Sequence, residues 1–119
     1  MAAGERRLTP EEEAILLAML GPDFPGSAEL RAQVPSVLVT GGCACGCDTI
    51  DLRVAGDPAA APVPDGDPLS ADIRGTSDGV LLFVRGGYLS CLEVYTPDDA
   101  PARLPGPDRL NVRPPGKPS

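Results

Sequence analysis

Three cysteines stand close together in the middle of the chain, in the sequence Gly41-Gly-Cys-Ala-Cys-Gly-Cys-Asp48, and a fourth follows far along the chain. The four candidate metal ligands are Cys43, Cys45, Cys47 and Cys91. Thiolates bind tetrahedral Zn²⁺ and iron–sulfur clusters, and four cysteines match an all-sulfur site. The spacing is poor, because structural zinc sites use Cys-x₂₋₄-Cys knuckles and this cluster would bend the backbone sharply around one ion. A zinc site is therefore one of several hypotheses.

Two other interpretations of the cysteines stay open. A pair from the cluster can form a reversible disulfide, although a Cys-x-Cys ring is strained and a reducing compartment keeps thiols free. Alternatively, the clustered cysteines are small apolar residues at a crowded hairpin tip, and Cys91 is a strand residue that faces the protein core. Because Asp48 follows Cys47, the acidic surroundings also disfavour the low thiol pKa that a redox enzyme needs.

The chain contains no histidine. This removes Ser-His-Asp and Cys-His catalysis and every metal site that uses an imidazole. Its one lysine, Lys117, lies in a Pro-rich end, which excludes a buried Schiff-base lysine. Gly41-Gly42 and Gly86-Gly87 lack the frames of phosphate-binding loops. The composition thus leans away from an enzyme.

Carboxylates and tyrosines offer weaker signals. Asp48 with Asp51, or Asp72 with Glu93, can meet across a sheet, but carboxylates that alternate along strands usually form the solvated face. Tyr95 follows Glu93 by two positions, so both side chains share one face of a strand. With Arg85 or Arg74, this face can form a small binding surface, or its tyrosine can shield a sheet edge.

The elements that would position these residues begin with two helices. Thr9-Pro10-Glu11-Glu12 predicts a helix start, with a Thr-x-x-Glu capping box and proline at the first helical position. We expect this helix to run to Leu20, with its apolar residues at helical spacing. Ser27 is the predicted cap of a second helix over Ala28–Val34, which must end before Pro35.

Five strands are indicated after the helices. Val37–Val39 and the alternating segment Thr49–Val54 predict an antiparallel hairpin whose connection is the cysteine cluster. Leu69–Arg74, Val80–Arg85 and Tyr88–Tyr95 predict a three-stranded meander. The Gly86-Gly87 pair supports a tight turn, since both positions can take positive φ. We expect an α+β fold in which the N-terminal helix pair packs on an antiparallel sheet of four to five strands.

One domain is expected over residues 1–96, followed by a Pro-rich, mostly flexible tail at 97–119. The tail has too few apolar residues to offset its ordering entropy. Its best candidate for ordered structure is a short stretch around Leu110-Asn-Val112, laid against a sheet edge.

The formal charge of the chain is −7. Residues 1–96 hold 14 acidic and 6 basic side chains, a net charge of −8. Such a surface repels phosphate backbones and anionic lipid headgroups, so we expect no nucleic-acid or membrane partner and favour a basic protein partner. The N-terminal residues show no export signal, and we expect a cytoplasmic location.

The segments Asp23-Phe-Pro-Gly26, Cys43-x-Cys-Gly-Cys47 with Thr49–Leu52, and Leu89-Ser-Cys-Leu-Glu-Val-Tyr95 resemble an uncharacterised family of short proteins from high-GC bacteria. The resemblance spans roughly residues 9–96 and implies no activity. The Glu-Val-Tyr strand with its Pro-rich end is also similar to the endings of some bacterial immunity proteins, which implies a partner-binding role.

The sequence favours a small non-enzymatic protein that binds another protein. The alternatives are a thiolate metal-binding protein that uses the four cysteines, and a thiol-based redox protein. Neither the partner nor the oligomeric state follows from the residues.

Overall fold

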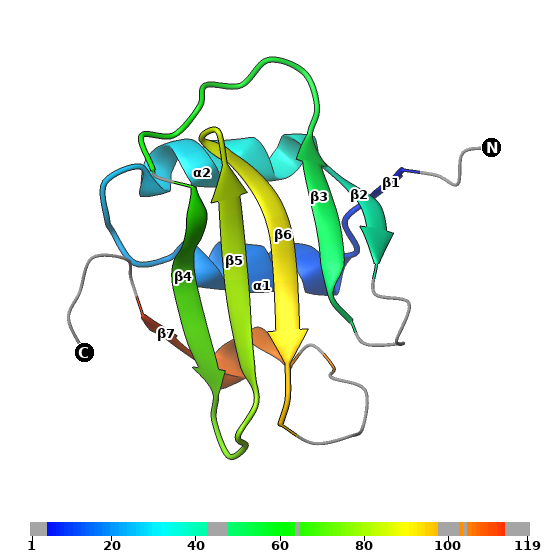
Figure 1. Ribbon diagram of the computed structural model, residues 1–119, viewed down its shortest axis with the longest axis vertical. Coiled ribbons are helices and arrows are strands. Elements are labelled where there is room, and N and C mark those ends of the chain that lie inside the picture. The colour runs from blue at the N-terminus through cyan, green and yellow to red at the C-terminus, as the bar shows by residue number, and fades with distance from the viewer. Residues whose placement is uncertain (1–4, 43–47, 64, 98–102, 104, 114–119) are drawn as a thin grey trace.

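A computed structural model gives the architecture of the protein and describes residues 5–42, 48–63, 65–97, 103 and 105–113. Two helices, two 3₁₀ turns and seven strands are found in this described part of the chain (Figure 1). The helical elements are α1 (Pro10–Met19), α2 (Ser27–Gln33), η1 (Val34–Ser36) and η2 (Pro107–Arg109). The strands are β1 (Arg6–Arg7), β2 (Val37–Gly42), β3 (Ile50–Val54), β4 (Gly66–Ile73), β5 (Gly79–Arg85), β6 (Tyr88–Tyr95) and β7 (Leu110–Arg113).

The predicted capping box starts α1. Glu12 N donates to Thr9 Oγ1 over 3.1 Å, and Thr9 N donates to Glu12 Oε1 over 2.9 Å, so two backbone donors that the helix start leaves free are satisfied. Arg6 adds a bidentate ion pair, with both of its terminal nitrogens 2.9 Å from the Glu12 carboxylate. This pair ties the first strand to the helix.

Helix α2 begins one residue earlier than predicted, because Gly26 and not Ser27 is its cap. Gly26 has a φ of 96°, a left-handed conformation that glycine adopts without strain. The Ser27 hydroxyl accepts a hydrogen bond from Phe24 N and lies inside the helix. After Gln33 the chain continues as η1, where Pro35 is tolerated in a single 3₁₀ turn.

The sheet is antiparallel and its strand order is β1-β2-β3-β6-β5-β4-β7. The predicted α+β class, the hairpin β2–β3 and the meander β4–β5–β6 are confirmed. The predicted count of four to five strands is wrong, since the described residues form seven. The two missed strands are the edges: β1 has two residues, too few to show alternation, and β7 lies in the Pro-rich segment.

Strand β7 pairs with β4 through the register Ala71–Val112 and Ile73–Leu110, at the stretch around Leu110 that was expected to meet an edge. Within the predicted tail, residues 98–102, 104 and 114–119 lie outside the described residues.

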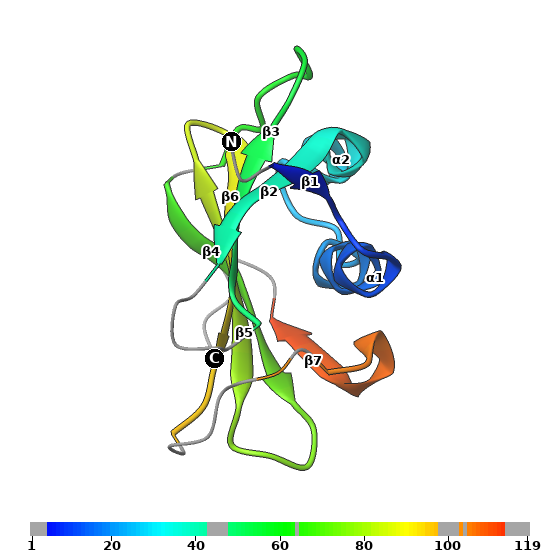
Figure 2. The ribbon, with the colours of Figure 1, turned by 90° about the vertical axis from the view of Figure 1, so that its right-hand side faces the viewer.

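Both helices cover the same face of the sheet, and the core lies between them and the strands (Figure 2). The core consists of Leu, Ile, Val and Ala with one methionine, Met19, as expected from a chain so poor in aromatic residues. The sheet is strongly curved, so β1 and β7 both lie on the side of the helices, with α1 between them (Figure 2). Helix α1 contacts β4, η2 and β7 on one side, and its Glu12 holds Arg6 of β1 on the other.

Candidate functional site

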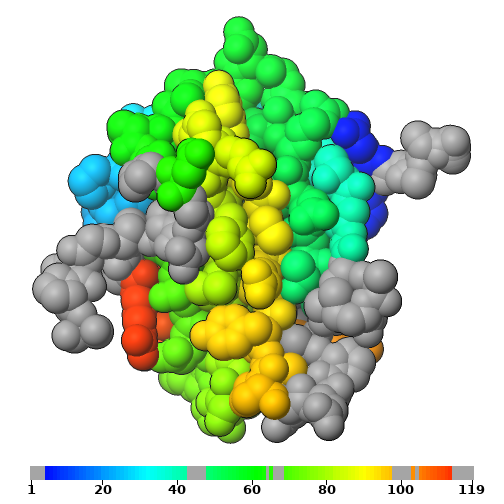
Figure 3. All heavy atoms as spheres, in the orientation of Figure 1, coloured from blue at the N-terminus to red at the C-terminus, as the bar shows by residue number. Residues whose placement is uncertain are grey.

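The face of the sheet opposite the helices carries the side chains that are available for binding. Along β3, Ile50 and Leu52 are buried while Asp51 and Arg53 are exposed, so alternation divides the strand into a core side and an outer side. We call the outer side the open face; within the part of the chain that the structure describes, no helix lies on it (Figures 2 and 3). Its members on the central strands are Asp51, Arg53, Leu81, Phe83, Arg85, Ser90, Cys91, Glu93 and Tyr95.

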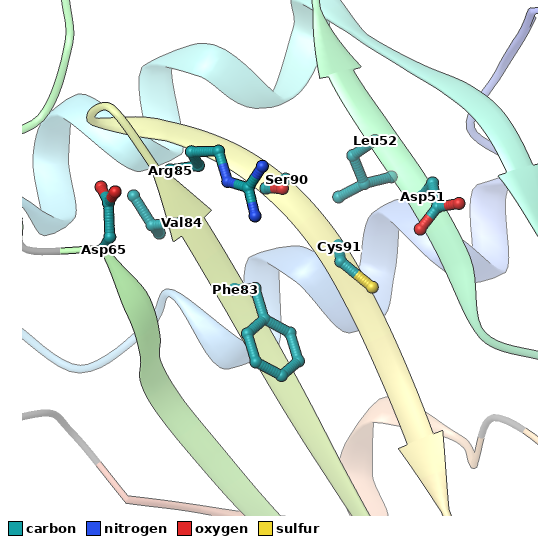
Figure 4. A pocket seen from close by; sticks show the side chains of 8 residues that line it. All are labelled: Asp51, Leu52, Asp65, Phe83, Val84, Arg85, Ser90 and Cys91. Carbon is teal, nitrogen blue, oxygen red and sulfur yellow. The ribbon is translucent and has the colours of Figure 1, made fainter.

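A hollow of about 650 Å³ lies in the open face, within the 300 to 1,000 Å³ range of ligand pockets. It sits where β3 and β6 stop pairing: the two strands are in register at Ile50–Leu92 and Asp51–Cys91 and not beyond. The hollow is lined by Asp51, Leu52, Asp65, Phe83, Val84, Arg85, Ser90 and Cys91 (Figure 4).

Cys91 lines this hollow as a free, half-buried thiol and does not face the core. It lies between Asp51 of β3 and Phe83 of β5, its register partners on the two sides. Burial raises the pKa of Cys91 to about 11, and the charges of Asp51 and Glu93 and a hydrogen bond to Asp51 add to the shift. The thiol is therefore protonated near neutral pH and is a poor nucleophile.

The other three predicted metal ligands, Cys43, Cys45 and Cys47, lie outside the described residues. Among the residues that are described, no group of three or more cysteines and carboxylates could hold a metal ion. The four-cysteine site remains a prediction.

The acidic side chains of the sheet divide into two groups. Asp72 is paired with Arg113, and Asp48 lies 3.2 Å from Arg103, so one member of each carboxylate pair considered from the sequence is bound to an arginine. The other members, Asp51 and Glu93, are both near Cys91: Asp51 is its register partner on β3, and Glu93 lies two residues along β6. Neither has an ion pair within the described part of the chain. The centre of the open face is therefore acidic.

Arg85 is the basic residue of the hollow. Of the described arginines, it and Arg7 have side chains without a hydrogen bond or ion pair to other described residues, whereas Arg53, for example, lies 2.6 Å from Glu5. Figure 4 shows the Arg85 side chain reaching over Ser90 toward the middle of the hollow. Its guanidinium is available to a ligand.

Tyr95 shields the sheet near the end of β6. It is 39% exposed, and its ring lies across Gly79, its register partner on β5, so closely that a Cβ at Gly79 would overlap it. The expectation that this tyrosine shields a sheet edge is wrong, because β6 lies between β3 and β5 in the interior of the sheet. The ring covers a neighbouring strand at Gly79 instead. Leu17, on α1, is the other large apolar side chain that is well exposed in the described chain, at 44%.

Sequence reasoning missed two residues that shape the site. Gln33 is completely buried, and its side chain binds the backbone of Ala59, Gly87 and Leu89. Asp65 lines the hollow and accepts a hydrogen bond from Gly86 N over 2.8 Å. A glutamine near the end of a short helix and an aspartate in a Pro-rich loop carry no sequence signal for such roles.

No helix of the described residues is both long enough and apolar enough to cross a membrane. Comparisons with protein-family models, with curated proteins and with solved structures find nothing that matches this chain.

Proposed function

We propose that this protein is a small non-enzymatic binding protein that takes a basic protein partner on its open face. The observation that carries the proposal is the uncovered centre of the sheet, where Leu81 lies beside Glu93, and Phe83 and Asp51 flank Cys91. Neither carboxylate has a cationic partner among the described residues. An exposed apolar patch that is rimmed by charged and polar side chains is typical of a docking surface.

Electrostatics supports a basic partner. The net charge of −8 over residues 1–96 would attract a positively charged protein over a distance of about one Debye length, roughly 8 Å at physiological salt. Paired arginines such as Arg53 contribute little net attraction to an anion. Among the described residues of this face without an ion pair, the carboxylates of Asp51, Asp65 and Glu93 outnumber the single guanidinium of Arg85, so the net charge there is negative.

The chemistry of the described residues agrees with a binding role. The most perturbed titratable group in the hollow, Cys91, is protonated at neutral pH, and the chain offers no histidine to activate it. We place the function in the cytoplasm, where thiols stay reduced, because Cys91 is a free thiol.

Affinity capture with matched variants tests the proposal. The wild-type protein, Phe83→Ser and Asp51→Lys are used as baits at near-physiological salt, with Leu17→Ser on α1 as the control for loss of an exposed apolar side chain. We expect a basic protein that the wild type and Leu17→Ser retain and that both open-face variants lose. Recovery of no such protein, or equal recovery by all four baits, would overturn the proposal.

The thiolate metal-binding function stays the second candidate, since Cys91 lies on the open face where a ligand can reach it. Elemental analysis of untagged protein purified under reducing conditions tests it, with a count of reactive thiols. One equivalent of zinc that is lost in Cys91→Ser would support the four-cysteine site; no metal in the wild type would exclude it. A redox role for Cys91 is disfavoured by its raised pKa.

A further inference from the structure

One end of the hollow, at Asp51, Leu52, Ser90 and Cys91, lies at a fork in the sheet. Strands β5 and β6 pair from Gly79–Tyr95 to Arg85–Tyr88, whereas β3 and β6 pair only at Ile50–Leu92 and Asp51–Cys91. Beyond this point β3 continues to Val54 and β6 curves away from it, and α2 lies behind the space between them (Figure 1). We call this divergence of the two strands, where one end of the hollow lies, the fork.

A buried polar side chain holds the fork open. The Gln33 amide donates to Ala59 O over 3.0 Å and to Gly87 O over 2.8 Å, and its oxygen accepts from Leu89 N over 3.0 Å. These bonds fix the first residues of β6 to α2 and to the preceding loop. The Gln33 side chain has no exposed surface, and a buried amide without these hydrogen bonds would be costly. The hydrogen bonds therefore stabilise the divergence of β6 from β3.

The β3 side of the fork is an unpaired strand edge. Ala55 N donates to Ser36 O over 2.8 Å, toward the β2 side. In an antiparallel ladder the backbone groups of successive residues point to opposite sides, so the N–H and C=O of Val54 point into the fork, where β6 offers no register partner. An unpaired edge of this kind is what an added strand binds.

The lining of the fork specifies the side chains of such a strand. Of the residues that line the hollow, Asp51 and Leu52 are on the β3 side of the fork, and Ser90 and Cys91 are on its β6 side. Leu52 is buried toward the core, whereas Asp51 is exposed on the outer side. Side chains of an extended segment point alternately to the two sides. An occupant that alternates apolar with basic residues therefore matches both sides, and Arg85 can donate to its main-chain carbonyl groups.

We propose that the fork receives an extended segment of the basic partner, which adds as a short strand to the free edge of β3. This inference rests on the proposed function and names the part of the partner that binds. Strand addition predicts that the main chain of the partner forms hydrogen bonds with β3. Docking on the open face by charge and apolar contact would not require these hydrogen bonds.

The probe is a synthetic ten-residue peptide that alternates valine and lysine, measured by fluorescence polarisation against the full chain at near-physiological salt. Two matched peptides carry N-methyl groups on all valines or on all lysines, which removes the main-chain donors of one edge and keeps the charge. We expect at least one methylated peptide to bind at least tenfold more weakly. Equal binding of all three peptides, or no binding of the parent, would overturn strand addition.

A protein variant gives the matching test from the other side. Val54→Pro removes the N–H that points into the fork and leaves the donors of β3 that point toward β2, while Val54→Ala trims the side chain and keeps the N–H. We expect Val54→Pro to lose at least tenfold in peptide affinity relative to Val54→Ala. Similar affinities of two folded variants would count against the inference; if Val54→Pro does not fold, the N-methylated peptides decide.

The two proposals fail in distinguishable ways. If the baits capture a basic partner in a Phe83-dependent manner but the methylated peptides bind like the parent, the binding function holds and strand addition is wrong. If no basic partner is captured, the proposed function is wrong, and peptide binding at the fork then has no biological ligand behind it.

Discussion

The Cys91 thiol shows how the neighbours of a side chain decide its chemistry. Two carboxylates near it, Asp51 and Glu93, oppose formation of the thiolate, and partial burial has a larger effect in the same direction. A cysteine in this setting is a protonated, weakly polar side chain at neutral pH. This property separates it from the low-pKa cysteines of redox enzymes.

The raised pKa predicts slow alkylation of Cys91. At pH 7.5 the site should react much more slowly with iodoacetamide than an unhindered cysteine, and its rate should rise continuously toward pH 11. Asp51→Asn removes a charge that opposes the thiolate, so the pKa should fall and the rate at pH 7.5 should increase several-fold. Peptide mass spectrometry follows Cys91 separately from the other cysteines, and an unchanged rate in Asp51→Asn would contradict this account.

Tyr95 and Gly79 form a second pair whose coupling can be measured. Gly79→Ala places a methyl group where the tyrosine ring lies, and we expect it to lower the free energy of unfolding by about 1 to 3 kcal/mol. In a Tyr95→Ala background the same change should be neutral or stabilising, because alanine loses less backbone entropy than glycine. A double-mutant cycle from urea unfolding gives the coupling, and additive effects would refute the packing of the ring on Gly79.

At the scale of single elements, the start of α1 links stability to pH. The Arg6 hydrogen bonds lower the pKa of Glu12 from its ordinary value of 4.5, and Thr9 adds to the shift. Because the pKa of Glu12 is lower in the folded state, its ionised carboxylate contributes fully to the free energy of unfolding above the ordinary pKa of 4.5. This contribution is lost as the pH falls through the folded-state pKa.

Glu12→Gln tests this linkage. The variant keeps an acceptor for Thr9 N but loses the ion pair with Arg6, and we expect a loss of about 1 to 3 kcal/mol at pH 7. As the pH falls and Glu12 becomes protonated, the difference in the free energy of unfolding between variant and wild type should shrink. Chemical denaturation at a series of pH values measures it; a constant difference down to about pH 3 would show that Glu12 does not act through its charge.

The hydrogen bonds of Gln33 connect α2 to the start of β6, and their contribution to stability can be tested in the same way. Replacement by leucine leaves Leu89 N and the carbonyl groups of Ala59 and Gly87 without their partner, and we expect a loss of about 2 to 5 kcal/mol. Ala32→Gln is the control, since it changes the exposed residue that precedes Gln33 in α2 and should be nearly neutral. Urea midpoints of both variants test this, and a neutral Gln33→Leu would mean that the fork does not depend on these bonds.

These elements also show what sequence can and cannot predict. The capping box at Thr9, the Gly86-Gly87 turn with both φ values positive, and the alternation of Ile50–Val54 are local patterns, and each was predicted correctly. The pairing of β3 with β6 joins segments separated by two other strands, and no local pattern fixes where it ends. The hollow, the fork and the role of Gln33 all follow from this long-range pairing.

At the scale of the whole molecule, β7 packs the last described segment of the chain against the rest of the domain. Leu110 and Val112 are half-buried against the core, and α1 contacts both β7 and η2. Leu110→Ser with Val112→Ser should therefore lower the free energy of unfolding by about 2 kcal/mol, from lost apolar burial. The neighbouring exposed residue serves as a control, since Asn111→Ser should be neutral. No loss in the double variant would show that β7 is dispensable.

The strong curvature of the sheet has a consequence for how chains can associate. The outer strands β1 and β7 are short, carry Arg6, Arg7 and Arg113, and curve toward α1, all features that discourage pairing with a second molecule. A strand that added to an outer edge would present a new edge, and association could continue without end. A strand in the fork has β3 on one side and β6 on the other, so it offers no edge for further growth. If the proposed strand addition takes place, an unpaired backbone inside the sheet limits each molecule to a single bound segment.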